Sequence, residues 1–360
     1  MAGFLGGIMN LNLSGYITTS TSYGLVTLNF LKSLTDLEVD VATHGISQED
    51  YKEFTPYVRK SALLAKKFDY RAPCLSIRHQ FDMATGIGFG PRFGYTFFEV
   101  NNLTDLECNN IKSLDELIVP SKWASEVCLD SGLFPPHICP PGYNEQVFRP
   151  IDYMPKKCIF LSVGKWEVRK QQDQIVRAFA KAFGAGDNVA LWMSCDNKFI
   201  KEFVEEKKKL YKNFLGEKLT LIDYLPSHND LARLMQMSYC FVAPSLAEGW
   251  NLPLLEAMGC GKFNIATNYS AHTEFCDAQS TILIGPTGLV PAIDNMWFKE
   301  GSETNNGEWC SYNEDDLVEA MRIAYRKYQD GTILNNEARE NAQKFTWLKS
   351  AQTMKDIIYG

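Results

Sequence analysis

The segment between Pro244 and Gly261 contains the residue types and spacing best suited to chemistry. It reads Pro-Ser-Leu-Ala-Glu-Gly-Trp-Asn-Leu-Pro-Leu-Leu-Glu-Ala-Met-Gly-Cys-Gly and follows a short apolar run at Tyr239–Ala243. Asn251 can cap a helix and Pro253 suits a first helical turn, so we expect a helix to begin here. The backbone N–H groups ahead of that helix then point outward and form an anion site, made by Gly249, Trp250, Asn251 and Leu252.

Two carboxylates accompany this anion site, Glu248 in the loop and Glu256 within the helix. Beside a bound diphosphate they are repulsive unless they face sugar hydroxyls, from which a carboxylate accepts strong hydrogen bonds. We therefore expect Glu256 to bind a ribose and Glu248 to contact a transferred sugar. Either glutamate taken alone is better read as an ordinary loop or helix residue, and only the complete string favours a site.

A second group of charges follows the apolar run Cys158–Val163. This turn contains Gly164, Lys165 and Lys170, and it precedes an amphipathic segment at Asp173–Phe183. Both lysines can reach a phosphate held at the strand end, where fixed cations stabilise the charge that builds on a departing phosphate. The alternative is a solvated basic turn with no ligand.

Short apolar runs alternate with helical segments through the second half of the chain. They predict strands at Cys158–Val163, Val189–Met193, Leu219–Ile222, Tyr239–Ala243, Phe263–Ala266 and Thr281–Ile284. The first half is less regular, with strands predicted at Phe4–Met9, Leu37–Ala42, Cys74–Ile77 and Glu116–Pro120, a helix from about Ser22 and a last helix over Glu337–Tyr359. Runs without polar alternation are typical of strands buried on both faces, so we expect an α/β fold with doubly wound parallel sheets.

Composition excludes several classes of protein. A chain of 360 residues with a formal net charge of −7 predicts two globular domains and excludes a basic nucleic-acid module. The ten cysteines are widely spaced and are read as small apolar residues in a reducing cytosol. The N-terminal residues lack the pattern of a signal peptide, and no apolar run is long enough to span a membrane. We expect a cytoplasmic protein, and no obligate protein partner is evident.

Two strings resemble the signatures of a known enzyme family. Ser162–Lys170 and Glu248–Glu256 resemble the Gly-Arg-Leu-x-x-x-Lys-Gly turn and the E-x7-E motif of the family 4 retaining glycosyltransferases. Val119–Trp123 looks like a strand end of that family, and Pro140–Pro150 looks like its interdomain segment. The resemblance extends over most of the chain, with three departures: Lys165 in place of Arg, Gln171 in place of Gly, and Trp250-Asn251 in place of Phe-Gly.

The resemblance implies the GT-B fold, in which two Rossmann-like domains face each other across a cleft. Residues 1–150 are then an acceptor-side domain, and residues 151–338 are a nucleotide-sugar donor domain. Residues 339–360 are a C-terminal helix that crosses back to the first domain.

The resemblance also implies roles for individual residues. It places Lys165 and Lys170 on the donor diphosphate, Glu248 near the donor sugar and Glu256 on the ribose. Further residues implied in or near the site are Tyr23 and Gly24 in the loop at the first helix, and His79, which matches the family's active-site histidine. A lone histidine is as often structural. Base recognition is expected after Leu219–Ile222, where Tyr224 and Leu225 carry no base-specific code.

The function implied is transfer of a sugar from a nucleoside diphosphate to an acceptor hydroxyl, with retention at the anomeric carbon. We expect a UDP- or GDP-sugar as donor, a saccharide or glycan as acceptor, and no metal ion or separate cofactor. The leaving diphosphate takes the acceptor proton in this mechanism. Two alternatives stay open: a phage-type enzyme that glycosylates a hydroxymethylated DNA base, and a GT-B protein that only binds a nucleotide sugar or acts as a phosphorylase or epimerase.

Two first-half segments have open interpretations. Tyr57–Arg71 is a basic amphipathic helix, which is either a solvated face or, through Arg59–Arg71, a weak contact with a membrane surface or nucleic acid. Gly86–Gly94 superficially resembles a dinucleotide fingerprint, but Pro91 breaks the helix that such a motif requires. We expect a flexible loop there, over the acceptor or simply on the surface.

Overall fold

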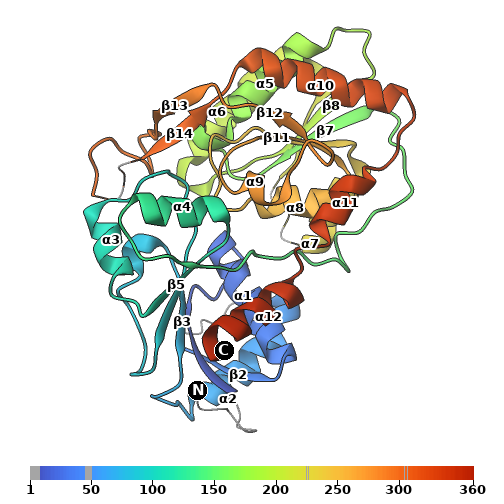
Figure 1. The fold of residues 1–360 in the computed structure, drawn as a ribbon. Coiled ribbons are helices and arrows are strands. Elements are labelled where there is room, and N and C mark those ends of the chain that lie inside the picture. Colours follow the sequence, from blue (N-terminus) through green and yellow to red (C-terminus); the bar gives the residue numbers. More distant parts are fainter. Residues whose placement is uncertain (1–8, 45–50, 224, 226, 304, 306) are drawn as a thin grey trace. The chain divides into compact units, whose positions relative to one another are not determined.

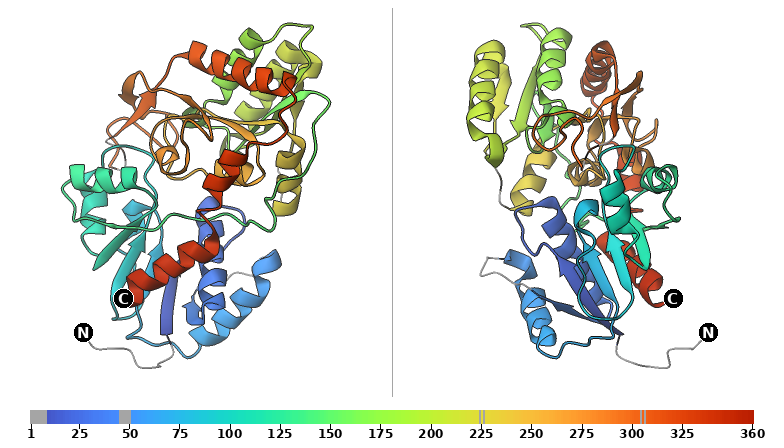
Figure 2. Two further views of the ribbon diagram at one scale, coloured as in Figure 1. Left: turned by 45° about the vertical axis from the view of Figure 1, so that its right-hand side comes forward. Right: turned by 90° about the vertical axis from the view of Figure 1, so that its left-hand side faces the viewer.

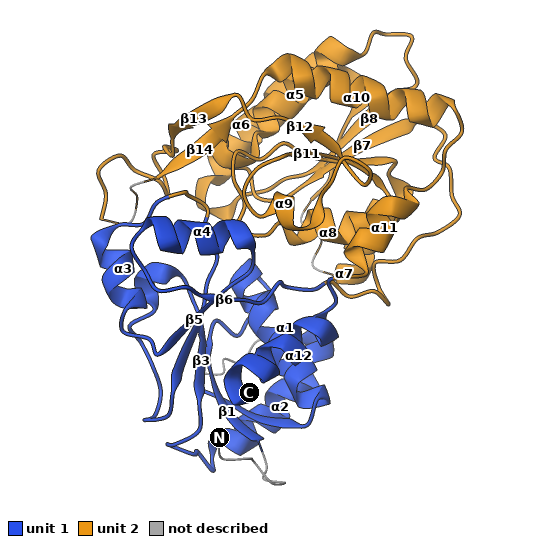
Figure 3. Ribbon diagram, in the orientation of Figure 1, with its two compact units in different colours: residues 1–98, 102–142, 345–360 blue, residues 99–101, 143–344 orange. Residues whose placement is uncertain are grey.

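The computed structural model describes residues 9–44, 51–223, 225, 227–303, 305 and 307–360. The chain divides into two compact units (Figure 3). Unit 1 comprises residues 1–98, 102–142 and 345–360, and unit 2 comprises residues 99–101 and 143–344. Each unit is a parallel sheet covered by helices, which confirms the predicted α/β fold of two Rossmann-like domains. The predicted domain boundaries were after residues 150 and 338.

The sheet of unit 1 has six parallel strands in the order β2-β1-β3-β4-β5-β6 (Figure 1). Their bounds are β1 Met9–Gly15, β2 Val39–Thr43, β3 Cys74–Ile77, β4 Arg92–Tyr95, β5 Glu116–Val119 and β6 His137–Ile138. The strand order reverses between β1 and β3, so the loops after these two strands meet at the carboxyl edge of the sheet.

The helices of unit 1 include the C-terminal one. Their bounds are α1 Ser22–Asp36, η1 Lys52–Phe54, α2 Thr55–Ala65, η2 Gln80–Asp82, α3 Asp105–Ile111, α4 Lys122–Asp130 and α12 Trp347–Tyr359. Thr21 caps α1 by accepting a hydrogen bond from the Gly24 N–H, and Leu28, Leu31 and Leu34 of α1 lie in the core. α12 packs against α1 (Figure 2), and the Tyr359 hydroxyl donates to the Asn10 carbonyl at 2.8 Å.

The sheet of unit 2 also has six parallel strands, in the order β12-β11-β10-β7-β8-β9. Their bounds are β7 Cys158–Val163, β8 Val189–Ser194, β9 Leu219–Leu221, β10 Cys240–Ala243, β11 Phe263–Thr267 and β12 Ile282–Ile284. A small antiparallel pair, β13 Gly288–Pro291 and β14 Glu308–Ser311, lies apart from this sheet. The order is that of a dinucleotide-binding fold and reverses between β7 and β10.

The helices of unit 2 cover both faces of its sheet (Figure 1). Their bounds are η3 Val168–Lys170, α5 Gln172–Ala182, η4 Lys198–Ile200, α6 Lys201–Leu215, η5 Gly216–Lys218, α7 His228–Met237, α8 Leu252–Gly259, α9 His272–Phe275, α10 Glu314–Gln329 and α11 Asn336–Ala342. The aromatic and aliphatic core between sheet and helices includes Phe160, Phe179 and Met321. In the part of the chain that the structure describes, no helix is both long and apolar enough to cross a membrane.

Several element predictions need correction. The sequence did not predict β4 or β6, and the first described strand, β1, follows the predicted strand Phe4–Met9, most of which lies outside the described residues. The predicted helix Glu337–Tyr359 is two helices, α11 and α12, separated at 343–346. The basic helix predicted over Tyr57–Arg71 ends at Ala65.

Candidate functional site

The reversal of strand order in unit 2 determines which loops meet. β7 and β10 are hydrogen-bonded neighbours, and the loops at their carboxyl ends begin at Gly164 and Pro244. Open parallel sheets bind ligands at such a reversal, because the two loops diverge and leave a crevice. The two strings that sequence analysis singled out therefore lie side by side.

The side chains of Lys170 and Glu248 are in direct contact at this point. The Lys170 ammonium lies 2.7 Å from Oε1 of Glu248, and the Ser245 hydroxyl donates to the same oxygen at 2.8 Å. The Glu248 backbone N–H donates to the Ser270 hydroxyl at 2.8 Å, which ties this loop to the segment after β11. Glu248 is buried and Lys170 only partly so. The carboxylate therefore has two polar partners on one oxygen, and the backbone of its loop is anchored separately.

Arg169 completes this network, although sequence analysis did not select it. Its guanidinium is buried and contacts three carboxylates: Glu248 Oε2 at 2.9 Å, Glu99 Oε1 at 2.7 Å and Glu167 Oε2 at 3.1 Å. It also donates to the Ala247 carbonyl at 2.6 Å. Glu99 lies far away in the sequence, so only the Arg-Lys pair ahead of a helix could have indicated this residue.

These ion pairs control the charge of Glu248. Burial alone would raise the pKa of this carboxyl, but the charges of Arg169 and Lys170 outweigh burial and hold that pKa well below its ordinary value. The carboxylate is therefore ionised throughout the physiological range. Because the pKa of the Arg169 guanidinium is raised by its three carboxylates despite burial, both partners stay charged.

Gly164 and Lys165 lie in the same turn but differ in their surroundings. Gly164 has a φ of +141°, and a Cβ on it would lie 3.3 Å from Cδ of Lys170, so the turn requires glycine. Lys165 is exposed, and its ammonium lies 5.8 Å from the ring centroid of Phe199. The structure thus brings Lys170, and not Lys165, into contact with Glu248.

The predicted cap of α8 is confirmed, with an additional partner. Asn251 has a φ of +79°, and its side chain accepts a hydrogen bond from the Leu254 N–H. Its amide Nδ2 lies 2.9 Å from Nε2 of the buried His272, whose Nδ1 lies 3.1 Å from the Thr267 carbonyl. A carbonyl only accepts, so Nδ1 carries the proton and Nε2 accepts from Asn251. Burial lowers the pKa of His272 to about 4, which keeps the imidazole neutral.

Glu256 lies in α8 and has very different surroundings from Glu248. Its side chain is buried, and in the described part of the chain it has no ion pair or hydrogen bond. Burial raises the pKa of the Glu256 carboxyl to about 8. One glutamate of the string is thus held ionised and the other protonated at neutral pH.

The other predicted donor-site residues take varied places in unit 2. Gly249 is buried, Leu252 begins α8, and the Trp250 ring packs 5.0 Å from that of Phe275. Leu225 is half-buried after β9, two strands away from β7, and Tyr224 lies outside the described residues.

Unit 1 brings its own predicted residues together at the reversal between β1 and β3. The Tyr23 ring lies 4.2 Å from that of His79, measured between centroids. Tyr16, which follows β1, lies within 6.4 Å of both rings, and Phe81 stacks on His79 at 5.1 Å. Sequence analysis did not select Tyr16 or Phe81, whose contacts depend on the strand order.

Hydrogen bonds and close packing hold Tyr23 in this cluster. Its hydroxyl accepts from the Phe97 N–H at 3.2 Å and lies 3.2 Å from the Thr96 hydroxyl, just beyond β4. A Cβ on Gly24 would lie 2.2 Å from the Thr18 carbonyl oxygen, so only glycine fits beside Tyr23. The structure thus assigns Gly24 a packing role.

The structure favours the second of the two interpretations of Gly86–Gly94, a loop on the surface. Its end, from Arg92, is part of β4, and the loop before it leads into the amino edge of the sheet. Tyr23 and His79 lie at the opposite, carboxyl edge of the sheet. The loop at 86–91 therefore does not cover them.

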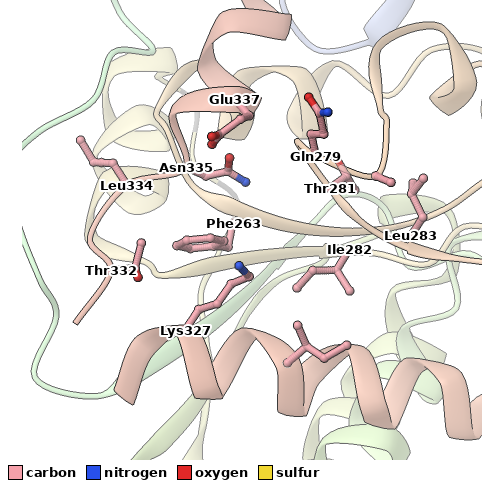
Figure 4. Close-up of a pocket in the computed structure, with 12 residues that line it drawn as sticks. Phe263, Gln279, Thr281, Ile282, Leu283, Lys327, Thr332, Leu334, Asn335 and Glu337 are labelled. Carbon is pink, nitrogen blue, oxygen red and sulfur yellow. The ribbon is translucent and has the colours of Figure 1, made fainter. Parts of the chain in front are cut away.

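An open pocket of about 920 Å³ in unit 2 contains none of the predicted site residues (Figure 4). It lies beside Phe263 and Ile282, the first residues of β11 and β12, with Lys327 and Asn335 also in its wall. It therefore lies at the amino edge of the sheet, opposite to the edge that carries Glu248.

Residues 145–294 match the family described as glycosyl transferases group 1. This segment is less than half of the chain and includes every charged residue of the unit 2 network except Glu99. No curated protein matches the sequence significantly.

Solved structures of similar fold extend over the whole chain. HepE of Anabaena in complex with UDP-glucose is 13% identical, with a TM-score of 0.69, and 97% of this chain and 98% of that chain are covered. Sucrose-phosphate synthase of Thermosynechococcus elongatus is 15% identical, with a TM-score of 0.70 and 97% of both chains covered. A glycosyltransferase of Rickettsia africae is 14% identical, with a TM-score of 0.70 and 97% of both covered. At these identities the likeness concerns the fold, which is that of GT-B glycosyltransferases.

Proposed function

We propose that this chain is a family 4 glycosyltransferase that moves a sugar from a nucleoside diphosphate to a hydroxyl of a saccharide or glycan, with retention at the anomeric carbon. The donor is a UDP- or GDP-sugar. The observation that carries the proposal is the Lys170–Glu248 contact at the strand reversal of unit 2. It lies within the segment that matches the glycosyl transferases of group 1, and a protein of the same fold binds UDP-glucose.

Lys170 is suited to hold the donor diphosphate. An ammonium has three N–H donors, and Lys170 gives one of them to Glu248. Two donors stay available for phosphate oxygens, and the charge stabilises the diphosphate as it departs. Lys165, exposed in the same turn, supplies a second cation when its side chain turns toward the phosphate.

Glu248 is suited to accept a hydrogen bond from the donor sugar. A carboxylate offers about four acceptor positions. Three are taken, by Lys170, Ser245 and Arg169, which leaves one for a sugar hydroxyl. The depressed pKa of Glu248 keeps this position an acceptor, so Glu248 orients the sugar and is not a proton donor.

Glu256 is suited to bind the ribose. Its buried carboxyl lacks a polar partner in the described structure, and hydroxyls of a bound ribose would supply one. Two ribose hydroxyls that donate to the carboxylate favour its ionised form, so nucleotide binding lowers the pKa of Glu256 and releases a proton.

Unit 1 is suited to the sugar and the acceptor. Tyr16, Tyr23 and His79 combine aromatic faces with polar atoms, the kind of surface on which a sugar ring packs while its hydroxyls are hydrogen-bonded. With retention, the leaving diphosphate accepts the acceptor proton, so the mechanism requires no protein base in this cluster.

A thermal-shift screen followed by an activity assay tests the proposal. The purified protein is screened against UDP, GDP, ADP and dTDP and their common sugars, and we expect one nucleotide to raise Tm. The selected donor is then incubated with saccharide acceptors, and release of nucleoside diphosphate and the anomeric configuration of the product are measured. Glu248→Gln should lower the rate at least 100-fold.

The matched control is Glu314→Gln, which removes a surface carboxylate paired with Arg177 and Lys181 and should leave the rate unchanged. A protein that binds no nucleotide and transfers no sugar contradicts the proposal. An inverted product would contradict retention alone, and release that requires inorganic phosphate would indicate a phosphorylase.

A further inference from the structure

Helix α2 of unit 1 exposes an apolar residue surrounded by cations. Leu63 is 63% exposed, and the positions three and four residues before and after it are Arg59, Lys60, Lys66 and Lys67. Hydrogen bonds from the Lys66 and Lys67 N–H groups to the Leu63 and Leu64 carbonyls continue the turn past the helix end. Residues at these spacings are neighbours on a helix, so the four cations surround Leu63.

An aromatic tip adjoins this helix in the sequence. Phe89 is 88% exposed and Tyr70 is 59% exposed, and their rings stack with centroids 6.3 Å apart. The Phe89 N–H donates to the Tyr70 carbonyl at 2.7 Å, which joins the loop after α2 to the loop before β4. A hydrogen bond and a ring contact thus hold the tip together. Arg71 adds a fifth exposed cation beside it.

The cations of this surface are almost unpaired. Among the described residues, Arg59, Lys66, Lys67 and Arg71 form no ion pair, and Lys60 approaches Asp40 only at 3.6 Å. The one carboxylate within the tip, Asp69, accepts from the Asn10 amide and the Arg71 backbone N–H. The surface therefore keeps a strong positive charge.

Helix α6 of unit 2 gives the contrasting case. It also exposes apolar side chains, Phe203 at 47%, Leu210 at 57% and Phe214 at 61%. However, the neighbouring Lys207 pairs with Asp173 at 2.7 Å and Lys208 with Glu205 at 3.0 Å. Exposed apolar residues occur on both helices, but α6 mixes its lysines with Glu202, Glu205 and Glu206, whereas α2 contains no carboxylate.

We propose that the α2 surface, formed by Arg59, Lys60, Leu63, Lys66, Lys67, Tyr70, Arg71 and Phe89, binds an anionic lipid membrane. Leu63, Tyr70 and Phe89 enter the interface while the basic side chains lie among anionic headgroups. A nucleic-acid backbone would attract the same cations but offers no apolar layer for Leu63 and Phe89. The inference is independent of the proposed function.

The place of this surface in the fold suits such a contact. The loops that carry Tyr70 and Phe89 lead into the amino ends of β3 and β4, whereas Tyr23 and His79 lie at the carboxyl edge of the same sheet. Membrane contact at the amino edge therefore leaves the aromatic cluster of unit 1 accessible to a ligand.

Co-sedimentation with vesicles tests the inference. The full chain is mixed with vesicles of phosphatidylcholine alone or of phosphatidylcholine with phosphatidylglycerol, at low and high salt. We expect binding only to the anionic vesicles, weakened by salt. Lys66→Ser with Lys67→Ser should reduce the partition coefficient roughly 25-fold, and Phe89→Ser about tenfold.

The matched control is Phe203→Ser with Phe214→Ser on α6, which removes exposed aromatic area from a helix of mixed charge and should leave binding unchanged. The Tm of each variant verifies that it is folded. The inference would be overturned if the protein did not bind anionic vesicles or bound neutral ones equally well. It would also be overturned if the protein bound duplex or single-stranded DNA and not vesicles.

Discussion

The two strand reversals of this molecule share a topology but carry opposite kinds of side chain. In unit 2, the loops after β7 and β10 join Lys170, Arg169 and Glu248 in a network of largely buried ion pairs. In unit 1, the loops after β1 and β3 join Tyr16, His79 and, from α1, Tyr23 in a cluster of aromatic rings. Sheet topology thus determines which loops meet, and the residues of those loops determine which side chains gather there.

The difference follows from the cost of burying charge. An isolated buried charge is expensive, so the unit 2 network pairs each cation with a carboxylate. Its polar atoms suit a ligand that is itself charged, such as a diphosphate. The unit 1 cluster needs no such pairing, and its faces and hydroxyls suit a neutral sugar.

The largest expected effect is from removal of the central cation of unit 2. Arg169→Met leaves three carboxylates without their shared partner and should lower the free energy of unfolding by about 3–5 kcal/mol in urea denaturation. The matched change in unit 1, Arg78→Met, removes a partly exposed pair with Asp82 and should cost about 1 kcal/mol or less. Equal losses would show that the two reversals do not differ in buried charge.

The second largest effect is expected for Glu256→Gln, which should change how the free energy of unfolding depends on pH. The pKa of Glu256 is about 8 in the folded protein and near 4.5 when exposed, so the folded state binds the extra proton between these values. Wild-type stability should therefore fall as pH rises from about 5 to 8, by roughly 2–4 kcal/mol from this group. Glu256→Gln should remove that slope and stabilise the protein at pH 8, while nucleotide binding is weakened.

Urea denaturation of both proteins across pH 5–9 checks this prediction. Parallel stability curves for wild type and Glu256→Gln would show that Glu256 is not held protonated. Near-normal nucleotide affinity in the variant would contradict the ribose assignment.

Gly24→Ala tests the packing of the unit 1 cluster. The new Cβ would lie 2.2 Å from the Thr18 backbone oxygen, so the loop must move, at a cost of about 2 kcal/mol. The control is Gly186→Ala, where a Cβ meets nothing within 4 Å. Thermal unfolding should separate the two variants, and equal Tm values would exclude a packing role for Gly24.

His272→Leu should have the smallest effect on stability in this series. It leaves the Asn251 amide and the Thr267 carbonyl without their partner, at a cost of about 1–2 kcal/mol, and weakens nucleotide binding about tenfold because Asn251 loses its support. His272→Gln, which keeps a donor and an acceptor, should restore part of the affinity. An unchanged nucleotide affinity in His272→Leu would exclude this positioning role.

Local signals in the sequence predicted much of this architecture. The buried strand Cys158–Val163 and the start of α1 at Ser22 have the predicted bounds, and Asn251 caps α8 as its side chain suggested. The predicted first strand stopped at Met9, where β1 begins, because Asn12 and Ser14 interrupt the apolar pattern beyond it. Asn12 can be buried in this strand because its amide donates a hydrogen bond to the Asp69 carbonyl at 2.9 Å, a contact between residues far apart in the sequence.

Only part of the charged network of unit 2 could be predicted from the sequence. Glu248 and Lys170 stood out through their positions after predicted strands, but their contact depends on the order of β7 and β10 in the sheet. The role of Arg169 depends on Glu99, which is distant in sequence. The same holds for Tyr16 and Phe81 beside His79, since periodicity gives strands but not their neighbours.

The central claim is that the unit 2 network binds the diphosphate of the donor. Calorimetric titration of the selected nucleoside diphosphate and its monophosphate into wild type, Lys170→Met and Glu256→Gln tests it most directly. We expect Lys170→Met to weaken the diphosphate about tenfold and the monophosphate hardly at all, and Glu256→Gln to weaken both alike. Equal affinity of the wild type for the two nucleotides, or an equal loss of both in Lys170→Met, would contradict the claim.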